Sequence, residues 1–596
     1  MGELYMKFSS KIKEFQYMKK HQLSAWDLSE IRPDHLQKAF QEIETRTKHI
    51  EHWRPKLKTK ISSKDFISLL AELEKLQILN SKVGVYAQLR FAEDSSDQEA
   101  GALQSQVENF LTNISNRLLF FNLWFKQLSE PEARRLISDS GKYRYFLEKM
   151  YKSKPYILDE KEEKIVNIKD VTGVSALNSI YNILCSQFQF DFEGKKIGQE
   201  ELLTAVRSTS PQRREAAYRT LLEKYRSHKD LIGEVYRNIV NDWREENIRL
   251  RGYDSPIHVR NVGNDIPDKA VEALLKVCER NGSLFQRFFE LKRKKLGLKK
   301  MRRFDLYAPL QKKKEKEIPY HEGITTVLET FHDFSPAFHR EALNIITADH
   351  IHSKVQKNKD TGAFCCSVTS KLNPYVLLNY TGTLRDVSTL AHELGHGIHH
   401  NLARGQTEFT FHAPLPLAET ASIFSEMVLS ERLLKKYPDR ARELLFTKLD
   451  EIYASIIRQA GFVRFEMKAH KMLEEGKTID EISKVYLQDL RKQLGPKVEI
   501  DDIYAYEWCY IPHIFHTPFY CYAYAFGNLL TLALYETYKE KGPGYADKIV
   551  EMLAKGGSQS PLEITKAVGV DITSEKFWQG GFDVISEMLK RVEDTR

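Results

Sequence analysis

Apolar side chains in the first two hundred residues recur at the spacing of a helical face. Between positions 63 and 82 they fall on one side of a helix, at Phe66, Leu69, Leu70, Leu73 and Leu76. Residues three and four apart in sequence lie side by side on a helix, so this stripe predicts a helix packed on a core. Ser63 is placed to cap its first turn. We therefore expect the N-terminal part of the chain to be helical.

Strand-like alternation is short and rare by comparison. Residues 188–194 alternate apolar and polar side chains before a glycine, which is typical of a short strand entering a turn. Similar strand-like segments occur at 303–310, 362–368 and 374–380, between long helical patterns. No internal repeat of fixed period is present. These patterns predict a mainly α fold with a small β-sheet in the second half, and two domains, N-terminal helical residues 1–205 and residues 206–596.

The composition is that of a folded protein with no bias toward nucleic acid. Of the 596 residues, 42% are hydrophobic and 29% are charged, as in ordinary globular proteins. The net charge of +8 comes from 90 basic and 82 acidic residues, a small imbalance on a surface this large. The basic run at 312–314 is followed closely by Glu315 and Glu317, which favours a solvated loop over a phosphate-binding track.

Cysteine usage and hydropathy bear on the cellular compartment. The six cysteines are sparse and contain no C-x-x-C pair, so neither a disulfide scaffold nor a cysteine-based zinc ribbon is indicated. The N-terminus lacks a continuous apolar signal region, and no apolar run reaches the roughly 18 residues of a membrane span. We expect a cytoplasmic protein in a reducing compartment, without a membrane partner.

A histidine pair in the second half of the chain has the spacing of two metal ligands. His392 and His396 enclose Glu393 in the pattern His-Glu-x-x-His. Residues four apart on a helix are separated by about 40° around its axis, so the two imidazoles lie side by side, as two zinc ligands require. Thr383 and Asp386 form a capping box that opens this helix. A chain of this length should contain about 0.04 such matches by chance, so coincidence is a poor explanation.

The glutamate inside the motif has a different predicted role. Glu393 projects about 100° away from His392 around the helix axis. It can therefore reach a water molecule on the metal without binding the metal itself. We expect Glu393 to be the general base of a hydrolytic reaction.

A catalytic zinc takes three protein ligands and leaves one position for water, so a third ligand is required. The metzincin class would have glycine at 399 and histidine at 402, whereas this chain has His399 and Leu402, which excludes that class. We expect His399 and His400 to contact solvent or the outer part of the site, because a further histidine ligand would fill the water's position. The third donor is then a carboxylate on a second helix.

A helix that begins after Pro414 and Pro416 offers this carboxylate. Glu419 and Glu426 are seven residues apart and share one face of it. One of them can bind the metal while the other accepts a hydrogen bond from a ligand imidazole. The alternative for Glu419 is a carboxylate that stabilises the first turn of its own helix.

With these motifs the chain resembles the oligoendopeptidase F and thimet oligopeptidase family of zinc metallopeptidases. The resemblance extends from about Gly252 onward, and more loosely over the N-terminal half. Besides the histidine motif it rests on four segments: Asp305-Leu306-Tyr307-Ala308-Pro309-Leu310, Gly362-Ala363-Phe364-Cys365, Pro374-Tyr375-Val376-Leu377-Leu378-Asn379-Tyr380 and Ala418-Glu419-Thr420-Ala421-Ser422. It implies a large helical ellipsoid with a deep substrate channel and a small β-sheet next to the zinc helix.

The resemblance also implies which residues serve the reaction. One zinc ion would be bound by His392, His396 and Glu419. Glu426, which shares the helix face of Glu419, is then the carboxylate left to contact a ligand histidine. The strand at 374–380 would offer its edge to the substrate backbone, a mode of binding that gives affinity without side-chain selectivity. The substrate-binding residues expected from it are Gly362, Ala363, Pro374, Tyr375, Val376 and Leu377.

Members of the family carry a C-terminal segment whose histidine and tyrosines face the scissile carbonyl. Donors aimed at the developing oxyanion would stabilise the transition state of peptide hydrolysis. The residues expected in this role are His513 and Tyr522, with Tyr520 and Tyr524 as neighbouring candidates. The chain departs from the family at Phe515, where a tyrosine is expected in many relatives, so that hydroxyl is either absent or replaced by a neighbour.

The predicted activity is zinc-dependent hydrolysis of internal bonds in short, unstructured peptides, with 206–596 as the catalytic domain. Glu393 would take a proton from the zinc-bound water and pass it to the leaving amine. Two alternatives stay open: a metallo-exopeptidase of the carboxypeptidase type on the same scaffold, and a non-catalytic peptide-binding protein whose metal is structural. The sequence leaves the oligomeric state open between a monomer and a small homo-oligomer.

Overall fold

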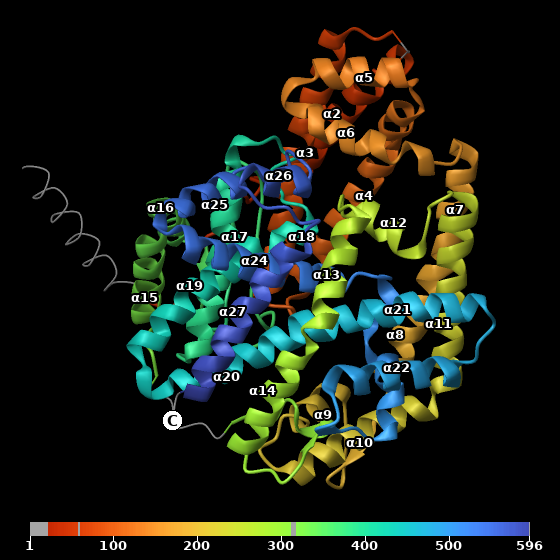
Figure 1. Ribbon diagram of the computed structural model, residues 1–596. Helices are drawn as coiled ribbons and strands as arrows, with labels where there is room; N and C mark the ends of the chain where they lie inside the picture. The colour runs from red at the N-terminus through yellow and green to blue at the C-terminus, as the bar shows by residue number, and fades with distance from the viewer. Residues whose placement is uncertain (1–21, 58–59, 311–316, 595–596) are drawn as a thin grey trace, which may run out of the picture. The chain divides into compact units, whose positions relative to one another are not determined.

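The computed structural model describes residues 22–57, 60–310 and 317–594, and most of them are helical (Figure 1). The prediction of a mainly α fold is confirmed. The basic run at 312–314 lies outside the described residues, and the predicted substrate channel stays a prediction. None of the helices formed by the described residues has the length and apolar character needed to cross a bilayer.

The chain forms two compact units, each assembled from separate stretches of sequence. The first contains the described residues of Met1–Lys154, Glu315–Lys436 and Tyr538–Gly569, and the second those of Pro155–Lys314, Tyr437–Thr537 and Val570–Arg596. The predicted boundary near residue 205 falls inside the second unit, between the contacting helices α9 (Gln199–Ala205) and α10 (Pro211–Ser227). A single cut cannot separate units between which the chain passes several times.

The N-terminal part of the first unit packs around the apolar stripe found in the sequence. Phe66, Leu69 and Leu70 are fully buried, on helix α3. The N-cap is Ser62, one residue before the predicted Ser63, and its hydroxyl accepts a hydrogen bond from the Asp65 backbone at 3.1 Å. The helices of this part are α2 (Leu36–Glu51), α3 (Ser63–Glu93), α4 (Gln98–Gln127), α5 (Glu130–Asp139) and α6 (Arg144–Lys152).

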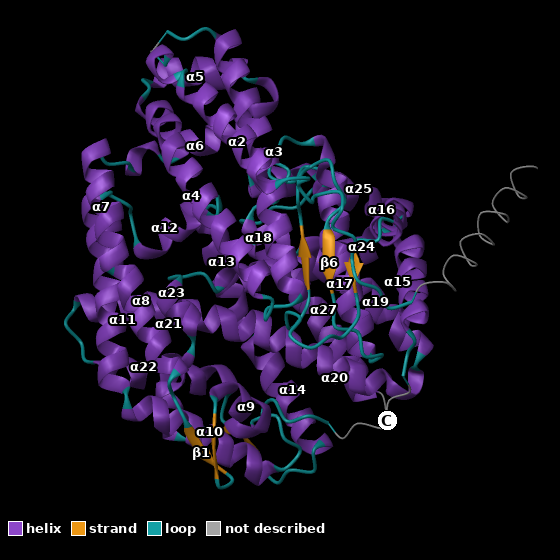
Figure 2. Cartoon of the chain, turned by 180° about the vertical axis from the view of Figure 1, so that it is seen from behind, coloured by secondary structure: helices purple, strands orange, loops and turns teal. Residues whose placement is uncertain are grey.

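The rest of the first unit combines helices with a three-stranded sheet (Figure 2). The sheet has the order β4-β6-β5, with β4 parallel and β5 antiparallel to the central strand β6. The elements are α15 (Tyr320–Phe334), α16 (Pro336–Thr347), β4 (Ile351–His352), β5 (Phe364–Cys366), β6 (Tyr375–Leu377), α17 (Leu384–Leu402), α18 (Leu415–Ala418), α19 (Thr420–Lys436), α25 (Ala546–Leu553) and α26 (Pro561–Ala567). The strand-like segments at 362–368 and 374–380 are therefore confirmed as strands.

The second unit is helical except for two small sheets. The segment predicted at 188–194 forms the hairpin of β1 (Phe190–Phe192) and β2 (Lys195–Ile197), and β3 (Met301–Arg302) pairs with β7 (Val498–Glu499). Its other elements include α7 (Glu160–Thr172), α8 (Val174–Ser186), α11 (Lys229–Trp243), α12 (Pro256–Gly263), α13 (Asp268–Arg280), α14 (Gly282–Lys295), α20 (Ala441–Ile452), α21 (Arg458–Glu474), α22 (Ile479–Leu494), α23 (Pro512–His516) and α27 (Glu575–Asp594). Helix α24 (Tyr522–Lys541) has residues in both units.

The strand predicted over 303–310 is wrong. Residues Arg303–Asp305 form a 3-10 turn after β3. The alternation of polar and apolar letters misleads because Arg303 and Asp305 are buried like their apolar neighbours, each in an ion pair: Arg303 with Glu507 and Asp305 with Arg214. An alternation of polarity predicts a strand only when the polar side chains face solvent.

Candidate active site

Helix α17 places the two histidines of the sequence motif on one face. Its capping box is formed as predicted: the Thr383 hydroxyl accepts from the Asp386 backbone at 3.2 Å, and the Asp386 carboxylate accepts from the Thr383 backbone at 3.0 Å. The rings of His392 and His396 lie 4.9 Å apart at an angle of 81°. The helix thus begins at a fixed residue and presents two imidazoles to one point in space.

A glycine lets the second helix approach this face closely. A Cβ atom added at Gly395 would lie 2.6 Å from the Cα of Ser422 and 2.7 Å from the carbonyl oxygen of Ala421, closer than packed atoms come. Backbone of α19 therefore occupies the space above Gly395. This contact brings the start of α19 against the histidine face, and Glu419 stands at the junction of α18 and α19.

Three donor atoms converge there. The Oε2 atom of Glu419 lies 3.4 Å from Nε2 of His392 and 3.3 Å from Nε2 of His396. Two ligands at zinc–nitrogen and zinc–oxygen distances of about 2.0–2.1 Å in a tetrahedral arrangement are separated by roughly 3.3 Å. The donor types and their spacing therefore fit a zinc ion held by His392, His396 and Glu419.

Side chains around the donors fix their orientation. Glu426, two turns after Glu419 on α19, lies 2.6 Å from Nδ1 of His392, as predicted for a carboxylate that contacts a ligand histidine. With Nδ1 donating to this carboxylate, Nε2 of His392 carries the free lone pair that a metal needs. The Ser422 hydroxyl donates to Oε2 of Glu419 at 2.8 Å. Two of the three donor residues are thus held by a neighbouring side chain of α19: His392 by Glu426, and the converging oxygen of Glu419 by Ser422.

Charges within the group shift the pKa values of its members. Burial opposes the charged form of His392, but the hydrogen bond and charge of Glu426 and the charges of Glu393 and Glu419 raise its pKa to about 9. Burial alone would raise the pKa of Glu419, yet its hydrogen bond with His396 and the histidine charges lower it to about 2. Burial raises the pKa of Glu393, against the opposing effect of the two histidines. The site therefore favours cations next to Glu419.

Glu393 faces a cavity of about 560 Å³ beside the three donors. Its side chain is 6% exposed. The cavity lies within the first unit, and its lining also includes Gln88 of α3, Ala363 and all of β5. Glu393 can therefore reach a molecule in this cavity, although it is not one of the three converging donors.

The prediction that the strand at 374–380 offers its edge to a substrate is wrong. That strand is β6, which pairs with β4 on one side and β5 on the other, so both of its edges are occupied. Tyr375, Val376 and Leu377 are also fully buried. The outer strand next to the cavity is β5, which directly follows Gly362 and Ala363. Sequence shows that a segment is a strand, but strand order depends on contacts between distant residues.

The two histidines after the motif are buried rather than exposed to solvent. His400 bonds through Nδ1 with the Ser367 hydroxyl at 2.9 Å and through Nε2 with the Leu372 carbonyl at 2.9 Å, which ties α17 to the loop between β5 and β6. His399 is 8% exposed and lines the cavity. Burial lowers the pKa of His399 to about 3 and that of His400 to about 4, so both are neutral.

The predicted C-terminal residues lie in the second unit, and three of them form one cluster. The Tyr524 hydroxyl lies 3.3 Å from Nε2 of His513, and the Tyr520 ring lies 5.9 Å from the His513 ring and nearly parallel to it. Tyr522 points elsewhere: it is fully buried, and its hydroxyl accepts a hydrogen bond from Asn264 at 2.8 Å. Phe515 packs in the core against Tyr181, with ring centroids 4.0 Å apart.

Two further residues, Glu466 and Arg260, hold this cluster, and sequence reasoning missed both. Phe519 has a positive φ of 59°, and its backbone donates to Oε1 of Glu466 at 2.8 Å. The Arg260 Nε group donates to the Pro518 carbonyl at 3.0 Å. Both side chains come from distant helices and shape the turn before Tyr520. For Glu466 a signal was available, because a glutamate beside the apolar residues Phe462, Val463 and Phe465 interrupts an apolar helix face.

Comparison with known proteins decides the family. The sequence model of peptidase family M3 matches residues 204–584, and that of oligopeptidase F matches residues 124–190. The chain belongs to peptidase family M3. The predicted family is thereby confirmed, and the protein is a peptidase whose substrates are peptides.

The likeness extends over nearly the whole chain. This peptidase is 25% identical over 588 residues to an oligoendopeptidase F homolog of Borreliella burgdorferi, covering 95% of this chain and 97% of that protein. It is 24% identical over 590 residues to oligopeptidase PepF of Bacillus subtilis, covering 96% and 87%. A crystal structure from Chlamydophila abortus matches with a TM-score of 0.85 at 25% identity, covering 96% and 98%. Oligoendopeptidase-F from Enterococcus faecium has the same fold, with a TM-score of 0.70 at 20% identity, covering 94% and 98%.

Proposed function

We propose that this peptidase is a zinc-dependent endopeptidase that cuts internal bonds of short, unstructured peptides. The observation that carries the proposal is the meeting of two imidazole nitrogens and one carboxylate oxygen at separations of 3.4 Å and 3.3 Å. His392, His396 and Glu419 would hold the ion. Bound zinc would supply Lewis-acid chemistry, polarising the scissile carbonyl and making water easier to deprotonate.

Glu393 handles the proton in this proposal. One of its carboxylate oxygens takes a proton from the attacking water and then returns it to the nitrogen of the leaving amine, so one residue serves as base and then as acid. Its position one residue after His392 keeps it beside the donor group. Burial raises its pKa from the ordinary glutamate value toward neutral pH, which makes it a stronger base. A carboxylate with an ordinary, lower pKa would be a weaker base toward the attacking water and would hold the proton less well until the amine accepts it.

The outer strand β5 and, from the family resemblance, the C-terminal cluster are the further parts of this proposal. Because β5 is the outer strand beside the cavity, its backbone can pair with an extended peptide through main-chain hydrogen bonds. The hydroxyls of Tyr520 and Tyr524 and the imidazole of His513 would donate hydrogen bonds to the oxyanion that develops on the carbonyl. We leave Tyr522 out of this set, because its hydroxyl is engaged with Asn264 in the core.

A substitution that removes only the base tests the role of Glu393. Glu393→Gln keeps the size of the side chain but cannot accept the proton, so we expect turnover to fall by roughly 10²–10⁴-fold while bound zinc is retained. Arg385→Gln, at an exposed position of the same helix, is the matched control and should keep both. Peptide turnover and metal content are measured on each variant. Wild-type turnover in Glu393→Gln would refute the role of this residue as base.

The endopeptidase assignment requires a separate experiment. Peptides blocked at both ends and their unblocked counterparts are digested, and the fragments are identified by mass, without chelator, with chelator, and with zinc added back. We expect internal cleavage that stops with chelator and returns with zinc. Trimming of unblocked peptides alone would identify an exopeptidase. Binding of peptides without any cleavage would identify a non-catalytic binding protein.

A further inference from the structure

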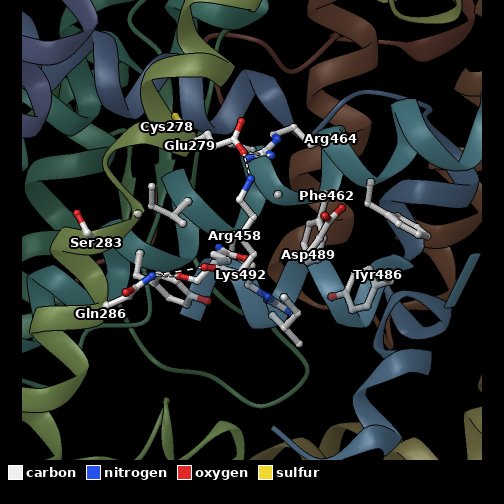
Figure 3. Close-up of a pocket in the computed structure, with 18 of the residues that line it drawn as sticks. Cys278, Glu279, Ser283, Gln286, Arg458, Phe462, Arg464, Tyr486, Asp489 and Lys492 are labelled. Atoms are coloured by element: carbon white, nitrogen blue, oxygen red, sulfur yellow. Dashed lines mark hydrogen bonds and ion pairs between the residues drawn. The ribbon is translucent and has the colours of Figure 1, made fainter. Parts of the chain in front are cut away.

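A second cavity, lined by none of the residues of the proposed reaction, lies within the second unit (Figure 3). Its volume is about 250 Å³, far more than the roughly 10–15 Å³ that holds one water molecule. Its walls come from α13, α14, α21, α22 and the π-helical segment Tyr453–Ile457, which joins α20 to α21. Arg303 and Glu507 close its polar end. The fold therefore maintains a space large enough for a small molecule.

The polar end holds a buried guanidinium that lacks acceptors. Arg303 is 1% exposed, and its Nη2 group donates to Glu507. Its Nε and Nη1 groups have no hydrogen-bond partner within the described part of the chain. The rings of Tyr504 and Tyr307 lie 5.0 Å and 5.6 Å from the guanidinium carbon and stabilise its charge, but a ring face is a weak acceptor. Unsatisfied buried donors of a charged group are costly, so an acceptor is expected there.

A second cation shares the same carboxylate. Arg458 donates to Oε1 of Glu507 at 3.4 Å and to the Tyr510 hydroxyl at 3.2 Å, while the Tyr486 hydroxyl donates to Oε2 of Glu507 at 3.1 Å. Two guanidinium groups thus face one carboxylate, which leaves one positive charge unbalanced. Arg458 keeps 20% of its side-chain surface exposed, whereas Glu507 keeps 1%. Because Arg458 is the more exposed of the two arginines, it is the charged group of this cluster that a ligand in the cavity can contact.

The other charges of the lining are already paired. Glu279 bridges Arg464 at 2.6 Å and Lys492 at 2.7 Å, and Figure 3 shows these three side chains meeting at one side of the cavity. Asp489 pairs with Lys468 at 2.6 Å. Carboxylates of the lining therefore have cations of their own and do not neutralise the deep pair of arginines. The buried lining atoms that lack a partner are Nε and Nη1 of Arg303 and Nε2 of Gln493, and all of these are donors.

Between the two charged regions the wall is apolar. It is formed by Ile457, Phe462, Phe465 and Leu490, together with Tyr453. An inorganic anion would use the arginines but leave this surface facing water. A ligand with an apolar body would bury it as well, with a gain proportional to the area covered. The lining thus favours an anionic head joined to an apolar body.

We propose that this cavity binds a small organic carboxylate with an apolar or aromatic body. The carboxylate accepts hydrogen bonds from Arg303 and Arg458. Each guanidinium group presents a planar fork of donors that matches the two oxygens of a carboxylate. The body lies against Phe462, Phe465 and Leu490. Free apolar amino acids and short fragments released by a peptidase belong to this chemical class. The proposal does not depend on the metal centre, which lies in the other unit.

Calorimetry with a defined probe tests the proposal on the whole protein. The probe is 3-phenylpropionate, and its neutral isostere 3-phenylpropionamide and acetate, which lacks the apolar body, are the controls. We expect 3-phenylpropionate to bind at least tenfold more tightly than either control. If the amide bound as tightly as 3-phenylpropionate, the role of the arginines would be overturned. If acetate bound as tightly, the role of the apolar wall would be overturned. No heat of binding would mean that the cavity holds only water.

Variants separate this cavity from the proposed metal site, where carboxylates also bind. Arg458→Met removes the unbalanced charge and leaves Arg303 and Glu507 as a matched pair, so the protein should fold and lose at least tenfold in affinity for 3-phenylpropionate. Glu419→Ala should bind the probe like wild type. Loss of binding in Glu419→Ala would place the probe at the metal site and overturn the proposal.

A crystal soak decides the location even if Arg458→Met fails to fold. The probe is 3-(4-bromophenyl)propionate on the wild-type protein, located by the anomalous signal of its bromine. We expect a bromine peak between Phe462 and Leu490. A peak only at the histidine pair, or none in this cavity, would overturn the proposal.

Discussion

At the scale of single residues, the side chains behind the metal donors control how the donors are presented. Glu426 lies 2.6 Å from Nδ1 of His392 and sets which ring nitrogen carries the lone pair. Carboxylates in this position typically contribute a factor of about 10–100 to metal affinity. In the proposed metal site Glu426 therefore matters as much as a donor that would touch the ion.

Replacement of Glu426 should weaken zinc binding without removing a donor. We expect Glu426→Ala to lower zinc affinity by roughly 10–100-fold. Glu426→Gln should lower zinc affinity less than Glu426→Ala, because the glutamine amide oxygen can still accept a hydrogen bond from the His392 ring. Competition with a chelating dye measures both affinities. Wild-type affinity in Glu426→Ala would show that the ring is held by something else.

Glu466 is a residue whose charge state should affect stability. It is 1% exposed, its Oε2 atom has no partner among the described residues, and burial raises its pKa to about 8. Its folded pKa thus lies above the ordinary value of a glutamate in the unfolded chain. The folded state holds the proton more tightly, so the contribution is fully favourable below about pH 4.5 and is lost as the pH rises to about 8.

Glu466→Gln should remove this dependence, because glutamine is neutral at every pH and can still accept from the Phe519 backbone. We expect the variant to resist urea better than wild type at pH 8.5, by an amount on the order of a few kcal/mol, and to match it near pH 5. Urea unfolding of both proteins at the two pH values measures the difference. A gap that is the same at both pH values would contradict a titrating Glu466.

At the scale of elements, the site depends on the contact between α17 and α19. Gly395 permits that contact because backbone atoms of Ser422 and Ala421 occupy the space of its missing Cβ. A Cβ added at Gly397, half a turn further along α17, would meet side-chain atoms instead: Cδ1 of Ile345 at 2.4 Å and Cγ of Pro374 at 3.2 Å. A clash with backbone must move a helix, whereas the end of a side chain can rotate away.

Gly395→Ala should therefore push the helices apart and separate Glu419 from the histidines. We expect it to lower stability by about 1–3 kcal/mol and to weaken zinc binding. Gly397→Ala is the control and should weaken zinc binding much less. Thermal unfolding and zinc titration are measured on both. Equal zinc affinities in the two variants would argue against helix contact as the device that positions Glu419.

Strand β5 carries the second prediction at this scale. If its free edge pairs with the substrate backbone, only alternate residues of the peptide direct their N–H groups toward it. We expect N-methylation of a good substrate to raise KM at every second position near the cleaved bond and to have little effect between. A series of singly N-methylated peptides measures this. Effects that are equal at neighbouring positions would contradict pairing with β5.

Local elements were predictable because their signals are local. The capping box at Thr383, the helix that follows it and the strands at β5 and β6 depend on residues within a few positions of each other. The order of the strands in the sheet was not predictable, because β4 and β6 are more than twenty residues apart in sequence. The strand predicted over 303–310 failed for the same reason. Arg303 and Asp305 are buried by ion pairs with partners that lie far away in sequence.

At the scale of the whole molecule, the residues predicted for the site are divided between the two units. His392, Glu393, His396 and Glu419 lie in the first unit, and the cluster of His513, Tyr520 and Tyr524 lies in the second. The donors fall within 28 residues of sequence, from 392 to 419. Spacing predicted the histidine pair and left Glu419 and Glu426 as candidates for the third donor, and the family resemblance favoured Glu419. Tyr520, Tyr522 and Tyr524 alternate along a short segment, and only the packing of the second unit separates the buried Tyr522 from the other two.

The position of the metal is the central claim, and anomalous diffraction at the zinc absorption edge tests it most directly. Crystals of the protein grown with zinc should show one strong peak bonded to Nε2 of His392, Nε2 of His396 and a carboxylate oxygen of Glu419. A zinc peak elsewhere in the chain, or a Glu419 side chain turned away from the ion with no other donor in its place, would contradict the account.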